Sequence, residues 1–225
     1  MAHTTPNMGI VGVPDTDNDP FDELVLGASF DRIDTLWGPN GPGATMKLIY
    51  DNRLAVDSAG WDVQNIPGNP GDDLILSFDG RSTFATVDDS MLRFNNDSAA
   101  NHYEQAVISV ANAAASAFDR TVAHGNALAQ IWFDGANSGI GGADDGANRS
   151  TVVEATIRNY AGVDFYKNVL GRVHANRWNG VNDIDATLYG ANWLSVAAIN
   201  RITISMLNGN VKTGSRLTIW RRAAA

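Results

Sequence analysis

Residues 201–220 read RITISMLNGNVKTGSRLTIW, and this stretch decides the fold class. Apolar and polar residues alternate in both of its halves, on either side of a turn marked by Asn208, Gly209 and Asn210. The apolar positions are Ile202, Ile204, Met206, Leu217 and Ile219. A period of two is typical of a β-strand with one face turned to a core, so the stretch predicts two such strands.

Similar strand signals recur throughout residues 44–225. They cover residues 46–50, 53–56, 74–78, 107–110, 127–133, 152–157 and 166–173, and Gly and Asn mark the turns between them. Roughly eight to ten short strands of this kind predict an all-β fold, an antiparallel β-sandwich of the jelly-roll type. Trp132 and Trp193 lie within apolar runs and are expected in the core. The Ala-rich residues 111–117 suit either a short helix or a strand of small residues.

Residues 1–43 have a different composition. Residues 1–20 contain three prolines and an acidic run, which predicts an extended arm without a core of its own. Residues 21–37 then carry an apolar stripe at helical spacing, which predicts a short amphipathic helix. The stripe consists of Leu26, Phe30, Ile33, Leu36 and Trp37. Residues 38–43, GPNGPG, predict a hinge, so the chain divides into an N-terminal segment, 1–43, and a head, 44–225.

Composition excludes several classes of function. The net charge of -9 argues against a nucleic-acid partner, because phosphate binding needs a basic surface. The chain contains no Cys, which excludes disulfides, thiolate metal sites and Cys nucleophiles. It has no run of apolar residues long enough for a transmembrane helix, and residues 1–20 lack the features of a signal peptide, so no membrane partner is expected.

Motifs that resemble reactive sites fail in detail. The acidic run at Asp15, Asp17 and Asp19 lacks the Gly and Glu that a calcium loop requires at later positions. Residues 135–146, GANSGIGGADDG, lack the Lys of a phosphate loop and are interpreted as a long surface loop. The four His residues show no metal-ligand spacing, and the nucleophile elbow of hydrolases is absent. The sequence therefore predicts no catalytic residue, no metal and no cofactor.

Trp178 is the candidate for contact with a ligand. It lies in the turn-like stretch NRWNG, outside the apolar runs. Aromatic rings stack on sugars when they are exposed and fill cores when they are not. An exposed Trp178 would therefore favour binding of a glycan.

Two regions resemble structural proteins of bacteriophage particles. TTPNMGI at 4–10 and LGASFDRIDTLWG at 26–38 resemble the N-terminal attachment segment of phage fibre and appendage proteins. LRFNNDS at 92–98 with NHY at 101–103 is similar to an FNGDS…NY element of phage virion proteins with a jelly-roll-like head. Further similarities lie at Trp193, 197–199, 202–204 and 214–219. Asn96 departs from the family, which has Gly there, and Trp220-Arg221 stands in place of Tyr-Gly.

The resemblance implies a non-enzymatic surface appendage of the virion, either a head fibre or decoration protein or a tail fibre. Attachment would use Pro6, Asn7 and Gly9 of the arm together with the helix stripe. A short helix is stable only when its apolar face is covered. We expect two further copies of the chain to cover it, which gives a homotrimer. Alternatively, the helix docks on another virion protein. The alternative is a lectin-like head that recognises a glycan receptor on the host. A glycan-cleaving spike is disfavoured because the chain shows no repeat.

Overall fold

The computed structural model describes residues 46–111, 121–133, 139–144, 149–178 and 182–224. These residues form twelve β-strands, and none of them lies in a helix. Residues 49–224 belong to one compact unit. The predicted all-β class is confirmed for this part of the chain. The predicted arm, helix and hinge at 1–43 lie outside the described residues.

The strands form two antiparallel sheets. The larger sheet has the order β1-β12-β3-β8-β9-β10-β5-β6 and the smaller has the order β2-β11-β4-β7. The strands of the larger sheet are β1 (Met46–Arg53), β12 (Arg216–Arg222), β3 (Asp73–Gly80), β8 (Thr151–Ile157), β9 (Lys167–Trp178), β10 (Asn182–Trp193), β5 (Tyr103–Ala111) and β6 (Thr121–Leu128). Those of the smaller sheet are β2 (Gly60–Gln64), β11 (Arg201–Met206), β4 (Ser90–Phe94) and β7 (Ile131–Trp132).

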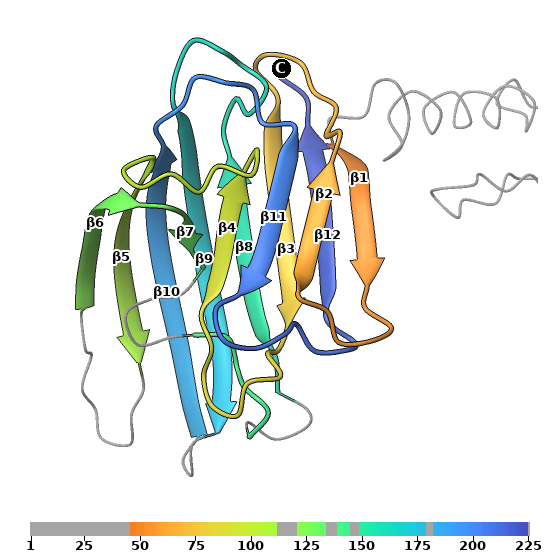
Figure 1. Cartoon of the computed structure of the whole chain (residues 1–225), viewed down its shortest axis with the longest axis vertical. Helices are drawn as coiled ribbons and strands as arrows, with labels where there is room; N and C mark the ends of the chain where they lie inside the picture. Colours follow the sequence, from red (N-terminus) through yellow and green to blue (C-terminus); the bar gives the residue numbers. More distant parts are fainter. Residues whose placement is uncertain (1–45, 112–120, 134–138, 145–148, 179–181, 225) are drawn as a thin grey trace, which may run out of the picture. The chain divides into compact units, whose positions relative to one another are not determined.

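The chain passes repeatedly from one sheet to the other. β2, β4, β7 and β11 belong to the smaller sheet, and each is followed in the chain by a strand of the larger one. In Figure 1 the smaller sheet lies in front of the larger, with the strands of both running along the long axis of the view. This arrangement places a core between the two sheets.

The core is built by the alternation that the sequence shows. Leu74, Leu76 and Phe78 of β3 are buried, and so are the apolar positions of β11 and β12 that predicted those strands. Trp61 of the smaller sheet meets Phe78 of the larger edge to face, with ring centroids 5.6 Å apart. Each fully buried side chain of this size stabilises the fold by about 1.5–3 kcal/mol.

Three strands of the larger sheet reach a common end. β9 begins at Lys167, β10 ends at Trp193 and β5 begins at Tyr103, and these residues are paired across the sheet. The loops 95–102, 158–166 and 194–200 therefore leave the strands at the same end. The candidate sites described below lie at this end and on the outer face of the same sheet.

Two strand predictions are corrected by the structure. Residues 127–133 do not form one strand, because β6 ends at Leu128 and β7 belongs to the other sheet. The side-chain amide of Gln105 forms hydrogen bonds with the backbone of β7. It accepts from Trp132 N at 2.9 Å and donates to Trp132 O at 2.5 Å. Trp132 is accordingly half-buried and not a core residue, whereas Trp193 is buried as expected. Residues 54–56 form no strand, and Val56 is exposed.

The interpretation of residues 135–146 as a surface loop is also corrected, in its described part. Ile140 is completely buried and exchanges two backbone hydrogen bonds with Asp88, of 2.7 and 3.0 Å. A Cβ on Gly142 would approach Thr86 O to 1.8 Å, so this backbone packs against the segment that follows β3. Gly residues permit the close approach that a larger side chain would prevent.

Candidate functional site

Part of the residues that carry the family resemblance, those at 94–103 and Trp193, meet at the common end of the three strands. Asp97 lies at the centre of this group, in the loop between β4 and β5. Its carboxylate accepts hydrogen bonds from Trp193 Nε1 at 2.7 Å, from Ala99 N at 3.0 Å and from His102 Nδ1 at 2.7 Å. Burial alone would raise the pKa of Asp97, but these hydrogen bonds outweigh it and hold the pKa below its ordinary value.

Tyr103 joins the same group from the start of β5. Its hydroxyl donates to Asp97 O at 3.1 Å and accepts from Phe94 N at 3.0 Å. The ring of Phe94 packs against those of Tyr103 and Trp193, with centroids 6.3 and 5.7 Å apart. Burial raises the pKa of Tyr103 to about 12, so the hydroxyl stays protonated and keeps both bonds at neutral pH.

Asn95 ties the turn after β4 to the loop before β11. Its side-chain nitrogen donates to Ala198 O at 2.8 Å, and its oxygen accepts from Asn200 N at 2.9 Å and Arg201 N at 3.1 Å. Both Asn95 and Asn96 adopt positive φ angles, of 52° and 59°. Asn tolerates this conformation better than most residues, which explains how Asn96 occupies a position where the resembling family has Gly.

These contacts define what we call the Asp97 cluster, made of Phe94, Asn95, Asp97, His102, Tyr103 and Trp193. It joins segments that are distant in the sequence, from the turn after β4 to the end of β10. His102 and Asp97 form an oriented pair of the kind found in hydrolases, but Asp97 Oδ2 is shared with the indole of Trp193. The cluster therefore links the turn after β4 to the start of β5 and to the end of β10.

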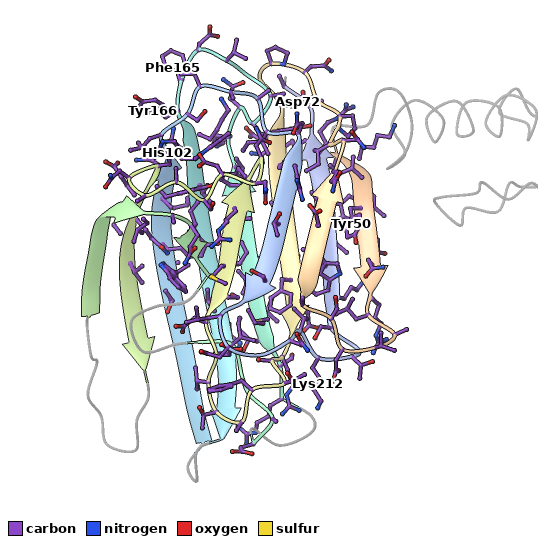
Figure 2. All side chains as sticks on the ribbon, in the orientation of Figure 1. Tyr50, Asp72, His102, Phe165, Tyr166 and Lys212 are labelled. Carbon is purple, nitrogen blue, oxygen red and sulfur yellow. The ribbon has the colours of Figure 1, made fainter. Side chains whose placement is uncertain are left out.

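A second feature at this end is an exposed apolar projection. We define the aromatic tip as Val163, Asp164, Phe165 and Tyr166 of the β8–β9 loop together with Val196 of the β10–β11 loop. Phe165 is 72% exposed and Tyr166 is 54% exposed. Figure 2 shows both side chains at the end of the molecule that also carries His102, beyond the ends of the strands. Exposed aromatic side chains are typical of contact surfaces.

Lys167 lies directly beneath the tip and is only 1% exposed. Its ammonium group donates to Gly162 O at 2.6 Å, to Phe165 O at 3.0 Å and to Val196 O at 3.3 Å. All three N–H donors of the ammonium are therefore used. Burial lowers the pKa of Lys167, and the nearby carboxylate of Asp164 acts in the opposite direction. Lys167 thus links the two loops of the tip by hydrogen bonds to backbone.

The outer face of the larger sheet forms a third candidate. A groove of about 510 Å³ crosses β8, β9 and β10 and is lined by Val152, Glu154, Arg172, His174, Ala186 and Leu188. Leu188 is 61% exposed, and Leu170 on the same face is 69% exposed. An ion pair between Arg172 and Glu154 lies within the groove. Exposed apolar side chains on a sheet face are frequent at contact regions.

The described part of the structure does not test the predicted site residues. Pro6, Asn7, Gly9, Leu26, Phe30, Ile33, Leu36 and Trp37 lie outside the described residues. Trp178 is the last residue of β9, and its side chain is also outside the description. Sequence reasoning missed the aromatic tip, because Tyr166 was assigned to a strand. The available signal was the stretch VDFY at 163–166, which has three apolar or aromatic residues in the loop just before β9.

Within the described ranges, no three His, Asp or Glu side chains gather as a metal ion would require. The same part of the chain contains no helix with the length and hydropathy needed to cross a membrane. Comparison of the chain with protein-family models, with curated proteins and with solved structures gave no match.

Proposed function

We propose that this protein is a non-enzymatic structural component of a bacteriophage particle, a surface appendage attached through residues 1–43. The observation that carries the proposal is the Asp97 cluster. Of the residues that resemble phage virion proteins, Phe94, Asp97, His102 and Tyr103 of the stretch 92–103 and the distant Trp193 belong to one hydrogen-bonded group. A short match by chance has no reason to converge in space, so the cluster supports a resemblance at the level of the whole fold.

The strand order supports the finer fold assignment that accompanies this function. When β1, β12, β8 and β9 are set aside, the remaining strands have the orders β2-β11-β4-β7 and β3-β10-β5-β6. These are the orders of the two sheets of a jelly roll. In this interpretation the hairpin β8–β9 is inserted into one sheet of the sandwich and β1 and β12 extend its edge. Jelly rolls are common in capsid and lectin domains.

An antibody against the purified protein tests the proposal. Immunoelectron microscopy of intact particles should show labelling of the surface at symmetry-related positions on the head or at the tail. These two locations are the alternatives that the resemblance leaves open, and the labelled position decides between them. Protein found only in the soluble fraction of the lysate, with unlabelled particles, would contradict a structural role in the virion.

The second candidate function is a receptor-recognising head that binds glycan on the host surface. The observation that favours it is the aromatic tip, because Phe165 and Tyr166 are exposed side by side in sequence at the loop end of the sheets. Sugar-binding surfaces use such rings. The two functions are compatible, since an appendage on a particle can carry a receptor-binding end.

A further inference from the structure

The aromatic tip exposes apolar side chains to water, which is unfavourable. Val163 is 60% exposed and Val196 is 47% exposed, beside the still more exposed Phe165. Exposed Leu or Val residues scattered singly are normal on protein surfaces, but four exposed apolar residues lie together in these two loops. Covering them with a ligand would remove apolar surface from water and would be favourable.

The tip is also held in place before any ligand arrives. The three hydrogen bonds of Lys167 connect Gly162 and Phe165 in one loop with Val196 in the other. Because Lys167 is buried, breaking these bonds would leave a charged group without partners in the interior. The loops therefore have little freedom to rearrange, and a ligand that binds the tip avoids the entropic cost of ordering it.

The chemistry of the tip selects the class of ligand. Asp164 is exposed between Val163 and Phe165 in the sequence, so the same loop offers a carboxylate to a ligand. A pyranose offers an apolar C–H face for aromatic rings and hydroxyl groups that donate to a carboxylate. A lipid surface is disfavoured, because Asp164 would lose its water without gaining a partner. The net charge of -9 disfavours acidic glycans and phosphorylated ligands.

The size of the tip argues in the same direction. A standard protein interface buries about 800 Å² on each partner and needs about 20–30 residues a side, whereas the tip has five residues. One or two sugar rings match a surface of this extent. We propose that the aromatic tip is a binding site for a neutral pyranose glycan, with Phe165 and Tyr166 as contact residues and Lys167 as the positioning residue. This inference rests on the second of the two proposed functions.

The first experiment measures binding of the full-length protein to a printed panel of neutral oligosaccharides, followed by calorimetry with the best binder. Phe165→Ala and Tyr166→Ala should each weaken binding by about tenfold, which corresponds to about 1.4 kcal/mol. Both residues are more than half exposed, so the melting temperature should not change. The matched control is Phe84→Ala, which removes a partly exposed ring from the loop after β3. This loop lies at the end of the larger sheet opposite to the aromatic tip.

The second experiment tests the positioning role of Lys167. Lys167→Met keeps much of the side-chain volume but removes the three hydrogen bonds to backbone. Amide hydrogen exchange should become faster at 162–166 and 196 while the amides of the Asp97 cluster stay protected, and glycan affinity should fall with it. Unchanged exchange in both loops would contradict the positioning role. If this variant does not fold, the Phe165 and Tyr166 variants still decide the binding site.

The outcomes separate the site from the function. Binding by the wild type that Phe165→Ala and Tyr166→Ala leave intact overturns the tip but keeps a glycan-binding head. No binding to any neutral glycan overturns both the tip as a sugar site and the second proposed function. Tip-dependent binding to phosphatidylcholine vesicles or to a purified host surface protein, with none to glycans, overturns the sugar assignment.

Discussion

The indole Nε1 of Trp193 donates a 2.7 Å hydrogen bond to Oδ2 of Asp97, although the two residues are 96 positions apart in the sequence. Trp193 is the last residue of β10, and Asp97 lies in the turn that follows β4 in the other sheet. This bond therefore joins a strand of one sheet to a turn of the other. Because Trp193 is only 2% exposed, its N–H depends on Asp97 as acceptor in the folded protein.

Asp97→Ala should lower the stability of the head markedly. The change leaves the indole N–H of Trp193 buried without an acceptor, which costs about 1–3 kcal/mol. For a domain of this size the melting temperature should fall by about 2–12 °C. Thermal denaturation followed by circular dichroism measures this shift. The control Asp144→Ala removes an exposed carboxylate and should leave the melting temperature unchanged.

Acid should weaken the same contact. The pKa of Asp97 is lower in the folded protein than its ordinary value of 3.8. At a pH at which the unfolded chain begins to bind a proton at this carboxylate, the folded protein therefore still keeps it charged. Its contribution is complete above the unfolded pKa and is lost as the pH falls through the folded pKa. Asp97→Asn does not titrate at this position. Urea denaturation should show the stability difference between the wild type and Asp97→Asn narrowing from pH 7 to pH 3, whereas an equal difference at both pH values would contradict the assignment.

The turn after β4 offers a matched pair of substitutions. Asn96 has a φ of 59°, so Asn96→Gly should change the stability by less than about 1 kcal/mol, whereas Asn96→Val should cost about 1–2 kcal/mol or more. Asn95 has a similar φ but also makes three side-chain hydrogen bonds. Asn95→Gly should therefore be clearly more destabilising than Asn96→Gly in denaturant titration. Equal costs would mean that the Asn95 bonds contribute nothing to stability.

Sequence reasoning found the strands whose alternation is strong and missed those in which it is weak. The apolar positions of β3, β11 and β12 were correctly placed inward. β10 was missed because its sequence, NDIDATLYGANW, has two acidic residues, a Gly and small side chains at intervals. Its buried positions include Tyr189, whose ring lies against Gly171 of the neighbouring strand. The packing of a tyrosine against a glycine of the neighbouring strand cannot be predicted from the periodicity of one strand alone.

The candidate sites required information that no local pattern contains. Asp97 and Trp193 belong to separate stretches of the sequence, and their contact depends on the crossing of the chain between the sheets. Likewise β11 and β12 are neighbours in sequence and belong to different sheets, so the turn at Asn208 is not the turn of a hairpin. The burial of Lys167 was invisible because Lys is normally exposed. The contact of Asp97 with Trp193, the separation of β11 from β12 and the burial of Lys167 all depend on contacts between segments that are distant in the sequence. Sequence periodicity does not predict such contacts.

Removal of residues 1–37 should separate folding of the head from attachment. The compact unit begins at Ile49 and contains the whole core described above, so the truncated chain should keep a cooperative β-type melt. It should no longer join the particle, because the predicted attachment residues are absent. Western blots of purified particles measure incorporation against the full-length protein. Full incorporation of the truncated head would contradict the role assigned to residues 1–43.

The oligomeric state is the last prediction, and two variants assign its cause. Light scattering of the wild type should give three times the chain mass of 24.0 kDa, because the stripe with Phe30 is too apolar to stay in water. Phe30→Asp would place three carboxylates near one axis and should dissociate the trimer. Leu188→Asp alters the exposed groove on the outer face of the sheet and should leave the trimer intact. If Leu188→Asp dissociates the trimer and Phe30→Asp does not, the head forms the trimer and residues 21–37 serve only in attachment to the particle. A wild-type mass of 24.0 kDa would contradict the trimer prediction.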